Sequence, residues 1–335
     1  MTDSNAAASK IPHSKADENA SVDGEMTGAS AMLKASGPEG HPRIGVAFGG
    51  GGAKGFAHVH AIKAFDDIGL RPAQITGASI GSIMGAGMAA GMSGADIEEH
   101  SLKAFGQGTE LISRIWNMRP KALTDVFGRE NRFGQLAGAR VLESFLPETM
   151  PENIEELAIP FAAITTDFFS MEEKVLDKGN LLEALAASSA IPGVFQAMPI
   201  NERFCIDGGV TNCLPFDRLG EDLDITIAID VAGEVSNTQM DRPPTALEAL
   251  VGSNLIMMRK MRELRLRQRH PDILIQAPVN AFAVQDFLRV GTILETTADL
   301  QNVLASQMDR MIERKLKGKQ CEPTMLLVEP RALAG

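Results

Sequence analysis

The chain has 335 residues, 44% of them hydrophobic, and a formal net charge of −11. This length and composition allow a full apolar core, in one large domain or two small ones, and the acidic balance argues against a dedicated nucleic-acid-binding protein. The three cysteines are odd in number and show no C-x-x-C spacing, which favours buried free thiols in a reducing compartment. We see no leader peptide and no apolar run of about 18 residues, so we expect a cytoplasmic protein that does not span a membrane.

The start of the chain differs in composition from the rest. Residues 1–42 are rich in Ala, Ser, Gly, Asp and Glu and contain almost no large apolar side chains. Such a segment cannot bury enough apolar surface to offset the conformational entropy that ordering would cost. We therefore predict a disordered N-terminal tail, with the ordered chain beginning at Arg43.

A strand, a glycine-rich loop and a helix follow the tail. Residues 44–48 are apolar and of strand length, residues 49–55 include five glycines, and residues 56–68 have the pattern of a helix closed by Gly69. This order is typical of an α/β domain with a mainly parallel sheet. Consecutive glycines let several backbone N–H groups turn toward one point beside the helix N-terminus, so we predict an anion site at the loop.

Two kinds of anion fit such a loop. Gly50, Gly52 and Gly55 match the G-x-G-x-x-G fingerprint for a dinucleotide pyrophosphate, but that fingerprint expects an acidic residue at the end of the second strand. The second predicted strand instead runs into Thr76-Gly77-Ala78-Ser79, and Asp66 falls too early, on the helix. The alternative anion is the oxyanion that forms when a serine attacks an acyl carbonyl.

The second strand and the helix after it enclose a candidate nucleophile. Residues 72–76 have the pattern of a strand, residues 77–81 form a G-x-S-x-G pentapeptide, and residues 80–91 are small, apolar and of helix length. A serine between a strand and a helix lies on a sharp turn that exposes its hydroxyl, and flanking glycines permit the turn. Since both loops lie at the carboxyl ends of neighbouring strands, we predict that Ser79 faces the glycine loop.

The rest of the chain continues this alternation of strands and helices, with one interruption. Residues 106–136 mix glycine, arginine and isolated large apolar groups, and we interpret them as an irregular insertion and a candidate lid over the site. The other predicted elements are helices over 93–105, 141–146, 180–189, 244–269 and 297–316, and strands over 161–166, 173–176, 203–206, 224–231, 273–276 and 325–328.

The chain offers two candidates for the base that a weakly nucleophilic serine hydroxyl needs. His270 would complete the order Ser79, Asp207, His270 of an α/β-hydrolase triad, but a solvated helix terminus before Pro271 explains this histidine better. Asp207 ends a predicted strand and enters Gly208-Gly209, which places its carboxylate at the sheet edge. Partial desolvation would raise the pKa of Asp207 and let it act as the base directly, whereas the alternative interpretation of this motif is a hairpin turn.

Three motifs occur together in an order and at a spacing that resemble the patatin-like phospholipase family. They are the glycine loop, the G-x-S-x-G pentapeptide and the D-G-G motif that begins at Asp207. Residues 165–167 and 187–193 also resemble segments that flank the site in this family, and the similarity covers residues 43–231. Besides Ser79 and Asp207, the motif residues are Gly50, Gly51, Gly52, Lys54, Gly55, Gly77, Gly81, Gly208 and Gly209.

This resemblance implies a fold, a domain organisation and a reaction. The fold is α/β, a three-layer α/β/α sandwich with a mainly parallel central sheet, with a catalytic domain over 43–240. Beyond about residue 240 the resemblance ends and the role of the chain is open, and we expect residues 241–335 to form an extension that packs on the same domain. The reaction is hydrolysis of lipid carboxyl esters of the phospholipase A or lysophospholipase type, with Ser79 as nucleophile and Asp207 as general base. Residues 50–52 would form the oxyanion hole, and the reaction would need no histidine, metal or cofactor.

Other functions stay open at this point. A catalytically weak lipid-binding or regulatory protein can use the same fold, and an esterase can use the triad of Ser79, Asp207 and His270. A nucleotide-binding oxidoreductase is a more distant alternative, because the acidic residue that its fingerprint expects is missing.

One helix bears on contact with membranes. Residues 259–269 carry six positive charges and one negative charge in an otherwise acidic chain, and Met257, Met258, Met261 and Leu264 offer an apolar side. A helix of this kind can rest on anionic lipid headgroups, which would make the protein peripheral at a membrane surface. The alternative is a helix packed on the core with a solvated outer face, and we favour it because such faces are common on surface helices.

Overall fold

The computed structural model describes residues 42–332, apart from 107–141, 143–145, 148, 193–194, 234–242, 244–245 and 320. The predicted tail, the predicted insertion beyond Gly106 and the predicted domain boundary at 240 lie outside the described residues, as does most of the predicted helix over 141–146. The described residues from 42 onward belong to one compact unit.

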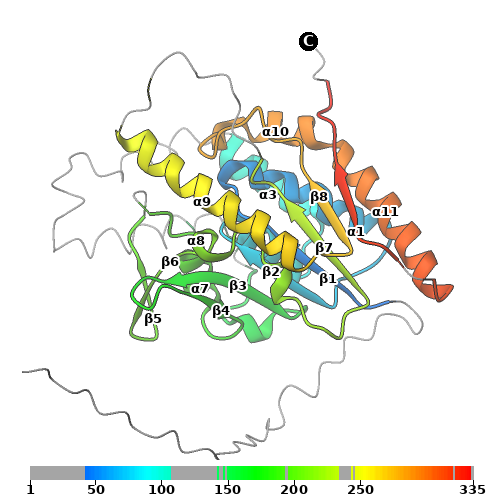
Figure 1. Ribbon diagram of the computed structural model, residues 1–335, viewed down its shortest axis with the longest axis horizontal. Coiled ribbons are helices and arrows are strands. Elements are labelled where there is room, and N and C mark those ends of the chain that lie inside the picture. Colours follow the sequence, from blue (N-terminus) through cyan, green and yellow to red (C-terminus); the bar gives the residue numbers. More distant parts are fainter. Residues whose placement is uncertain are drawn as a thin grey trace, which may run out of the picture. The chain divides into compact units, whose positions relative to one another are not determined.

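A mixed sheet of nine strands is the centre of this unit (Figure 1). Six strands run parallel to one another in the order β3-β2-β1-β7-β8-β9. Strand β6 lies between β3 and β5 and pairs antiparallel with both. The strands are β1 (Ile44–Phe48), β2 (Gln74–Ala78), β3 (Phe161–Asp167), β4 (Glu172–Leu176), β5 (Met198–Ile200), β6 (Arg203–Asp207), β7 (Ile225–Asp230), β8 (Ile273–Gln276) and β9 (Thr324–Leu327).

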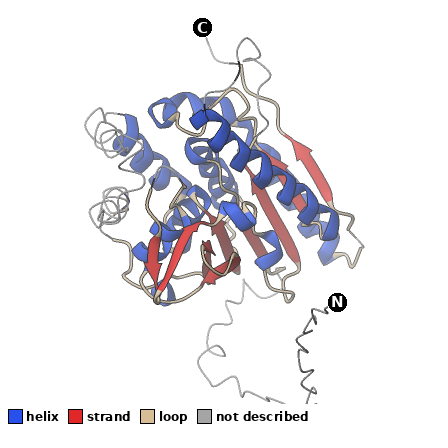
Figure 2. Cartoon of the chain, turned by 60° about the vertical axis from the view of Figure 1, so that its left-hand side comes forward, coloured by secondary structure: helices blue, strands red, loops and turns tan. Residues whose placement is uncertain are grey.

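Helices cover both faces of the sheet, which makes the fold a three-layer α/β/α sandwich (Figure 2). The glycine loop runs into a short 3-10 helix, η1 (Gly52–Ala57), and another, η3 (Phe216–Arg218), follows α8. The α-helices are α1 (His58–Asp67), α2 (Ile80–Ala89), α3 (Gly94–Gly106), α7 (Leu181–Ser188), α8 (Gly209–Asn212), α9 (Ala246–Gln268), α10 (Val290–Thr297) and α11 (Asp299–Leu316).

The two faces of the sheet bury very different amounts of apolar surface. Side chains alternate along a strand, so Ile44, Val46 and Phe48 of β1 point into the large core under α1, α2 and α11, while Ala47 points to the other face. That second face has a small cluster formed with Leu214, Phe216, Leu219, Ala228 and Leu274. The helices α8 and α9 lie on this second side.

The pairing of β3 determines where the functional residues meet. Along one edge of β3, β2 pairs with Phe161–Ile164 and β6 pairs with Thr165–Asp167. Both lie on the same edge, because β4 occupies the opposite edge over 163–167 and overlaps each of them in register. The carboxyl ends of β2 and β6 therefore approach each other head to head along β3.

The predicted fold class is confirmed, with local differences. The second strand is shifted two residues toward the C-terminus, to Gln74–Ala78, and β5 and α10 were not predicted at all. The interpretation of the D-G-G motif as a hairpin turn is wrong, because α8 begins at Gly209 instead. None of the three cysteines, all within the described residues, forms a disulfide, and Cys205 and Cys213 are buried while Cys321 is partly exposed.

Candidate active site

Ser79 lies on the sharp turn between β2 and α2. Its φ is +54°, a positive value that residues other than glycine rarely adopt, and such strain concentrates at functional sites. The turn is tight enough to exclude side chains at its flanks. A Cβ at Gly81 would overlap the carbonyl oxygen of Phe48, and one at Gly77 would overlap that of Gly81. The glycines of the pentapeptide are thus required by close packing of backbone on backbone.

Asp207 meets Ser79 at the junction of β2 and β6. Ala78 pairs with Ile164 and Asp207 pairs with Thr165, so successive positions on β3 bring the two side chains together. The Ser79 Oγ donates a hydrogen bond to Asp207 Oδ2 at 2.7 Å. The two residues predicted to act together therefore lie in direct contact, although 128 positions separate them in the chain.

The surroundings of Asp207 change its acidity. The residue is 5% exposed, and its Oδ1 accepts a hydrogen bond from the Gly209 N–H at 2.7 Å. Burial raises the pKa of Asp207 to about 6, although the hydrogen bonds from Ser79 and Gly209 oppose the rise. A carboxylate with this pKa is ionised at neutral pH and is more basic than an exposed aspartate, as a general base requires.

Ser188 connects the backbones around Ser79 and Asp207, a role that its place in a family-like segment of the sequence did not indicate. Its Oγ accepts a hydrogen bond from the Ser79 N–H at 2.9 Å and donates one to the Ile164 carbonyl at 2.6 Å. The Ser188 carbonyl in turn accepts from the Gly208 N–H at 3.1 Å. A fully buried side chain at the end of α7 thus fixes the backbone of both motifs.

The glycine loop lies beside Ser79, as its place after the neighbouring strand β1 predicted. A Cβ at Gly50 would lie 3.4 Å from that of Ser79. The Gly50 N–H already donates to the Cys213 carbonyl at 2.8 Å. Of the three predicted oxyanion donors, Gly50, Gly51 and Gly52, the first is therefore already engaged. Within the described part of the chain, neither the Gly51 nor the Gly52 N–H donates to a backbone carbonyl. Gly52 has a φ of +58° and a side chain there would overlap the Val284 carbonyl, so glycine is needed at this position.

Two basic side chains next to this loop contact backbone carbonyls, His58 that of Gly49 in the loop and Lys54 that of Ala232 beyond β7. His58 is fully buried, and its Nε2 lies 2.8 Å from the Gly49 carbonyl oxygen. Burial lowers the pKa of His58 to about 4, although the Gly49 contact opposes the shift, so the ring is neutral at pH 7 and donates this bond. Lys54 is 7% exposed and its Nζ donates to the Ala232 carbonyl at 2.9 Å. Burial lowers its pKa, opposed by Asp230 and Asp286.

His270 does not belong to the site. It is exposed and lies just before β8, which runs parallel to β7, β1 and β2. Parallel strands begin at one edge of the sheet and end at the other, so His270 lies at the edge opposite to the carboxyl ends that carry Ser79. The triad of Ser79, Asp207 and His270 is therefore wrong.

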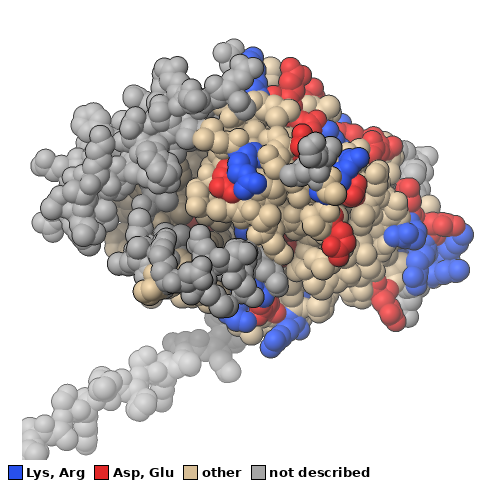
Figure 3. Space-filling model, turned by 90° about the horizontal axis from the view of Figure 1, so that it is seen from above, with Lys and Arg blue, Asp and Glu red and all other residues tan. Residues whose placement is uncertain are grey.

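The basic helix α9 turns part of its charge inward. Arg262 is 7% exposed and its Nη1 donates to both carboxylate oxygens of Asp230, at 2.7 and 2.5 Å. Arg265 pairs with Glu173 and Asp217. The packed-helix interpretation accounts for these arginines, while Met257 and Leu264 of the same helix stay exposed. On the face of the molecule in Figure 3, basic and acidic side chains are interspersed.

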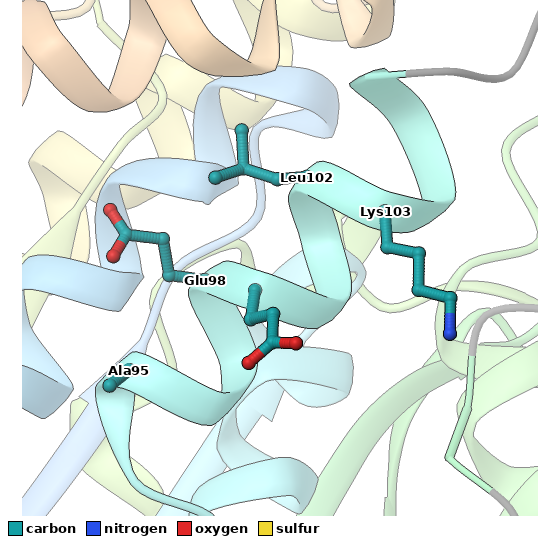
Figure 4. A pocket seen from close by; sticks show the side chains of 5 residues that line it. Ala95, Glu98, Leu102 and Lys103 are labelled. Atoms are coloured by element: carbon teal, nitrogen blue, oxygen red, sulfur yellow. The ribbon is translucent and has the colours of Figure 1, made fainter.

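A separate hollow of about 590 Å³ runs along α3, outside the site described above (Figure 4). The described residues that line it are Ala95, Glu98, Glu99, Leu102 and Lys103, and none of them belongs to the pair or to the glycine loop. Glu98 already accepts a hydrogen bond from Lys63 Nζ at 2.6 Å. Among the residues that the structure describes, we find no helix with the length and apolar character to span a bilayer.

The sequence matches agree with this geometry. A family model described as patatin-like phospholipase matches residues 46–219, just over half of the chain. The chain belongs to the patatin-like phospholipase family. Its matched region contains the glycine loop, Ser79 and Asp207, whereas α9, α10, α11, β8 and β9 follow it.

Relatives of this patatin-like protein include proteins named after an esterase. An uncharacterised NTE family protein of Mycobacterium tuberculosis is 32% identical over 217 residues, which are 64% of this chain and 56% of that protein. Neuropathy target esterase sws of Drosophila melanogaster is 26% identical over 177 residues, 52% of this chain and 12% of that protein. The chain thus spans about half the length of the mycobacterial relative.

Among solved structures, VipD from Legionella pneumophila matches with a TM-score of 0.39 and 13% identity, over 80% of this chain and 67% of that chain. The family assignment rests on the sequence matches, and the fold on the strand order and layers described above.

Proposed function

We propose that this protein is a serine acyl hydrolase that cleaves carboxyl esters of lipids, with Ser79 as nucleophile and Asp207 as general base. The observation that carries the proposal is the 2.7 Å hydrogen bond from Ser79 Oγ to Asp207 Oδ2, on a strained turn beside a glycine loop. Membership of the patatin-like phospholipase family supports lipid esters as the substrate class.

The first half of the reaction transfers the acyl group to the enzyme. As Ser79 Oγ attacks the ester carbonyl carbon, its proton passes to Asp207 Oδ2, and the carbonyl oxygen becomes an oxyanion. We assign the stabilisation of this oxyanion to the N–H groups of Gly51 and Gly52, because the Gly50 N–H is already used. The intermediate then expels the alcohol oxygen, which takes the proton from Asp207, and leaves an ester on Ser79.

The second half releases the acid and restores the enzyme. A water molecule gives a proton to Asp207 and its oxygen attacks the Ser79 ester carbon, which forms a second oxyanion at the same N–H groups. Collapse of this intermediate breaks the bond to Ser79 Oγ, and the proton on Asp207 returns to that oxygen. The products are a carboxylic acid and an alcohol, which for a phospholipid are a fatty acid and a lysophospholipid.

A covalent probe tests the proposed nucleophile. A fluorophosphonate should label the wild type and should fail to label Ser79→Ala, because the probe reacts with an activated serine hydroxyl. Ester hydrolysis by Ser79→Ala should fall by roughly 10⁴-fold to 10⁶-fold. The matched control is Ser253→Ala, which removes an exposed serine on α9 and should label like the wild type. Labelling of Ser79→Ala at the wild-type rate would remove Ser79 from the mechanism.

The pH dependence of turnover tests the proposed base. The pKa of Asp207 is raised to about 6, so its basic form is lost as the pH falls through that value. We expect kcat/KM on a soluble ester to be constant from about pH 7 to about pH 9 and to fall about tenfold per pH unit below pH 6. A flat profile down to about pH 4, where an ordinary aspartate titrates, would contradict Asp207 as the base.

A further inference from the structure

The helix α9 lies outside the family-matched region, yet it packs on the segment that follows Asp207 (Figure 1). That segment is α8, four residues long, which begins two positions after Asp207. So short a helix gains little stability from its own hydrogen bonds, and its orientation must come from its neighbours. The contacts between α9 and α8 therefore bear directly on the geometry around Asp207.

Arg265 of α9 holds the C-terminal end of α8. Its Nη2 donates to the Thr211 carbonyl at 3.1 Å and to Glu173 Oε2 at 2.8 Å, while its Nη1 donates to Asp217 Oδ2. The side chain is 24% exposed, so these bonds form at a partly desolvated position. One planar guanidinium thus connects a backbone carbonyl of α8 to two carboxylates on other elements, which the single ammonium of a lysine does poorly.

The two carboxylates are themselves fixed. Glu173 accepts hydrogen bonds from Arg218 Nε at 2.6 Å and Nη2 at 3.1 Å, and Asn212 of α8 donates to Glu173 at 3.2 Å and to Asp217 at 2.8 Å. Burial alone would raise the pKa of Glu173, but Arg218, Asn212 and Arg265 together keep it below its ordinary value. Two arginines and two carboxylates balance in charge around α8, so the network is held together without leaving a buried charge uncompensated.

At the other end of α8, α9 touches the residue that contacts Asp207. Gly209 donates its N–H to Asp207 Oδ1 at 2.7 Å, and a Cβ at Gly209 would overlap the Met258 methyl group. Met258 therefore packs directly against the Gly209 backbone. A shift of α8 would move the Gly209 N–H relative to the Asp207 carboxylate. Because this N–H orients the carboxylate, Asp207 would also move relative to Ser79 Oγ.

We propose that α9 is a positioning element for the catalytic base, in which Arg265 and Met258 hold α8 so that the Gly209 N–H orients the Asp207 carboxylate toward Ser79. This inference rests on the proposed function. It assigns a role to a helix beyond the family-matched region. It also explains why one of the basic side chains of α9, Arg265, points toward α8 and not toward solvent. Arg265 is a positioning residue and does not itself touch the reacting atoms.

The main test compares Arg265→Met with Arg267→Met. Both changes remove an arginine from α9, but Arg267 is exposed and serves as the matched control. We expect Arg265→Met to lower kcat by about tenfold to a hundredfold with KM nearly unchanged, because a displacement of about 1 Å at a reacting group has effects of this size. The acid limb of the pH profile should also move to higher pH, since the Gly209 hydrogen bond lowers the pKa of Asp207. Arg265→Lys should restore part of kcat, and Arg267→Met should match the wild type.

A second measurement does not depend on turnover. Amide hydrogen exchange of residues 208–213 should be faster in Arg265→Met than in the wild type and unchanged in Arg267→Met. If the wild type hydrolyses no ester and takes no fluorophosphonate label, the proposed function fails, and the exchange comparison still decides whether α9 holds α8.

Three results would overturn the proposal. The first is wild-type kcat and pH profile in Arg265→Met, even if this variant melts at a lower temperature. The second is an equal loss of kcat in Arg267→Met, and the third is unchanged exchange over residues 208–213. If Arg265→Met does not fold, Glu173→Gln takes its place, because it removes charge from the same network at nearly constant volume. It should lower kcat and shift the acid limb in the same direction, and an unchanged acid limb there would overturn the proposal.

Discussion

Two buried aspartates at the carboxyl edge of the sheet differ in the charge of their hydrogen-bond partners. Asp230, at the end of β7, is 3% exposed and receives two hydrogen bonds from the Arg262 guanidinium. Asp207, at the end of β6, is 5% exposed and is held by a hydroxyl and a backbone N–H. Burial is similar in the two cases, so the difference lies in the compensating charge. Within the described part of the chain no lysine or arginine pairs with Asp207, and a buried carboxylate of this kind is poised to accept a proton, whereas breaking a pair such as that of Asp230 would leave a buried charge uncompensated.

The largest expected effect comes from removing the partner of Asp230. Arg262→Met should lower the free energy of unfolding by about 3–5 kcal/mol, because it leaves a buried carboxylate without its counter-charge. Urea unfolding of the wild type and the variant measures this loss. The double variant Arg262→Met with Asp230→Asn is the control and should recover part of the loss. A loss below about 1 kcal/mol would mean that water reaches Asp230 and that the pair behaves like an exposed one.

The change at Asp207 should have the opposite sign. Its pKa is about 6 in the folded protein and 3.8 in the unfolded chain, so folding is disfavoured once the pH rises through this range and the buried group must ionise. At neutral pH this costs roughly 3 kcal/mol, and Asp207→Asn should gain stability of that order while losing activity. Thermal unfolding at several pH values measures the gain, which should vanish below about pH 4. Destabilisation by Asp207→Asn at neutral pH would show that the carboxylate is not strained by burial.

The smallest effect should come from an exposed ion pair on α9. Lys260 Nζ lies 2.8 Å from Glu263 Oε2, and the two side chains are 66% and 30% exposed. Lys260→Met should change the free energy of unfolding by less than about 1 kcal/mol, because solvent screens the pair. The same urea experiment tests this value alongside Arg262→Met, two positions away on the same helix. Similar losses in the two variants would end the distinction between the inner and outer charges of α9.

The glycine loop, the pentapeptide and the D-G-G motif could be recognised in the sequence because each is a short run of residues with a distinctive pattern of glycines. Gly52 has a left-handed φ and Gly77 lies against the backbone of Gly81 in the same turn, so both positions need glycine for local reasons, whereas Gly81 packs against the Phe48 carbonyl of the neighbouring strand. Apolar runs such as 44–48 and 224–231 likewise predicted buried strands, and the structure has them at β1 and, over Ile225–Asp230, at β7. These features determined the fold class and the candidate residues.

Other features required the tertiary structure. Ser188 lies in a segment that resembles the family, but the sequence did not indicate its role, and its hydroxyl joins Ser79 to Ile164 because α7 ends beside β3. The roles of Arg262 and Arg265 were equally hidden, since a basic helix has the same sequence whether its charges face lipid, water or buried carboxylates. The raised pKa of Asp207 depends on burial, which comes from residues far apart in the chain. The sequence by itself determined which groups carry the chemistry, and only the tertiary structure decided their distances, their partners and their ionisation, because these depend on contacts between distant segments.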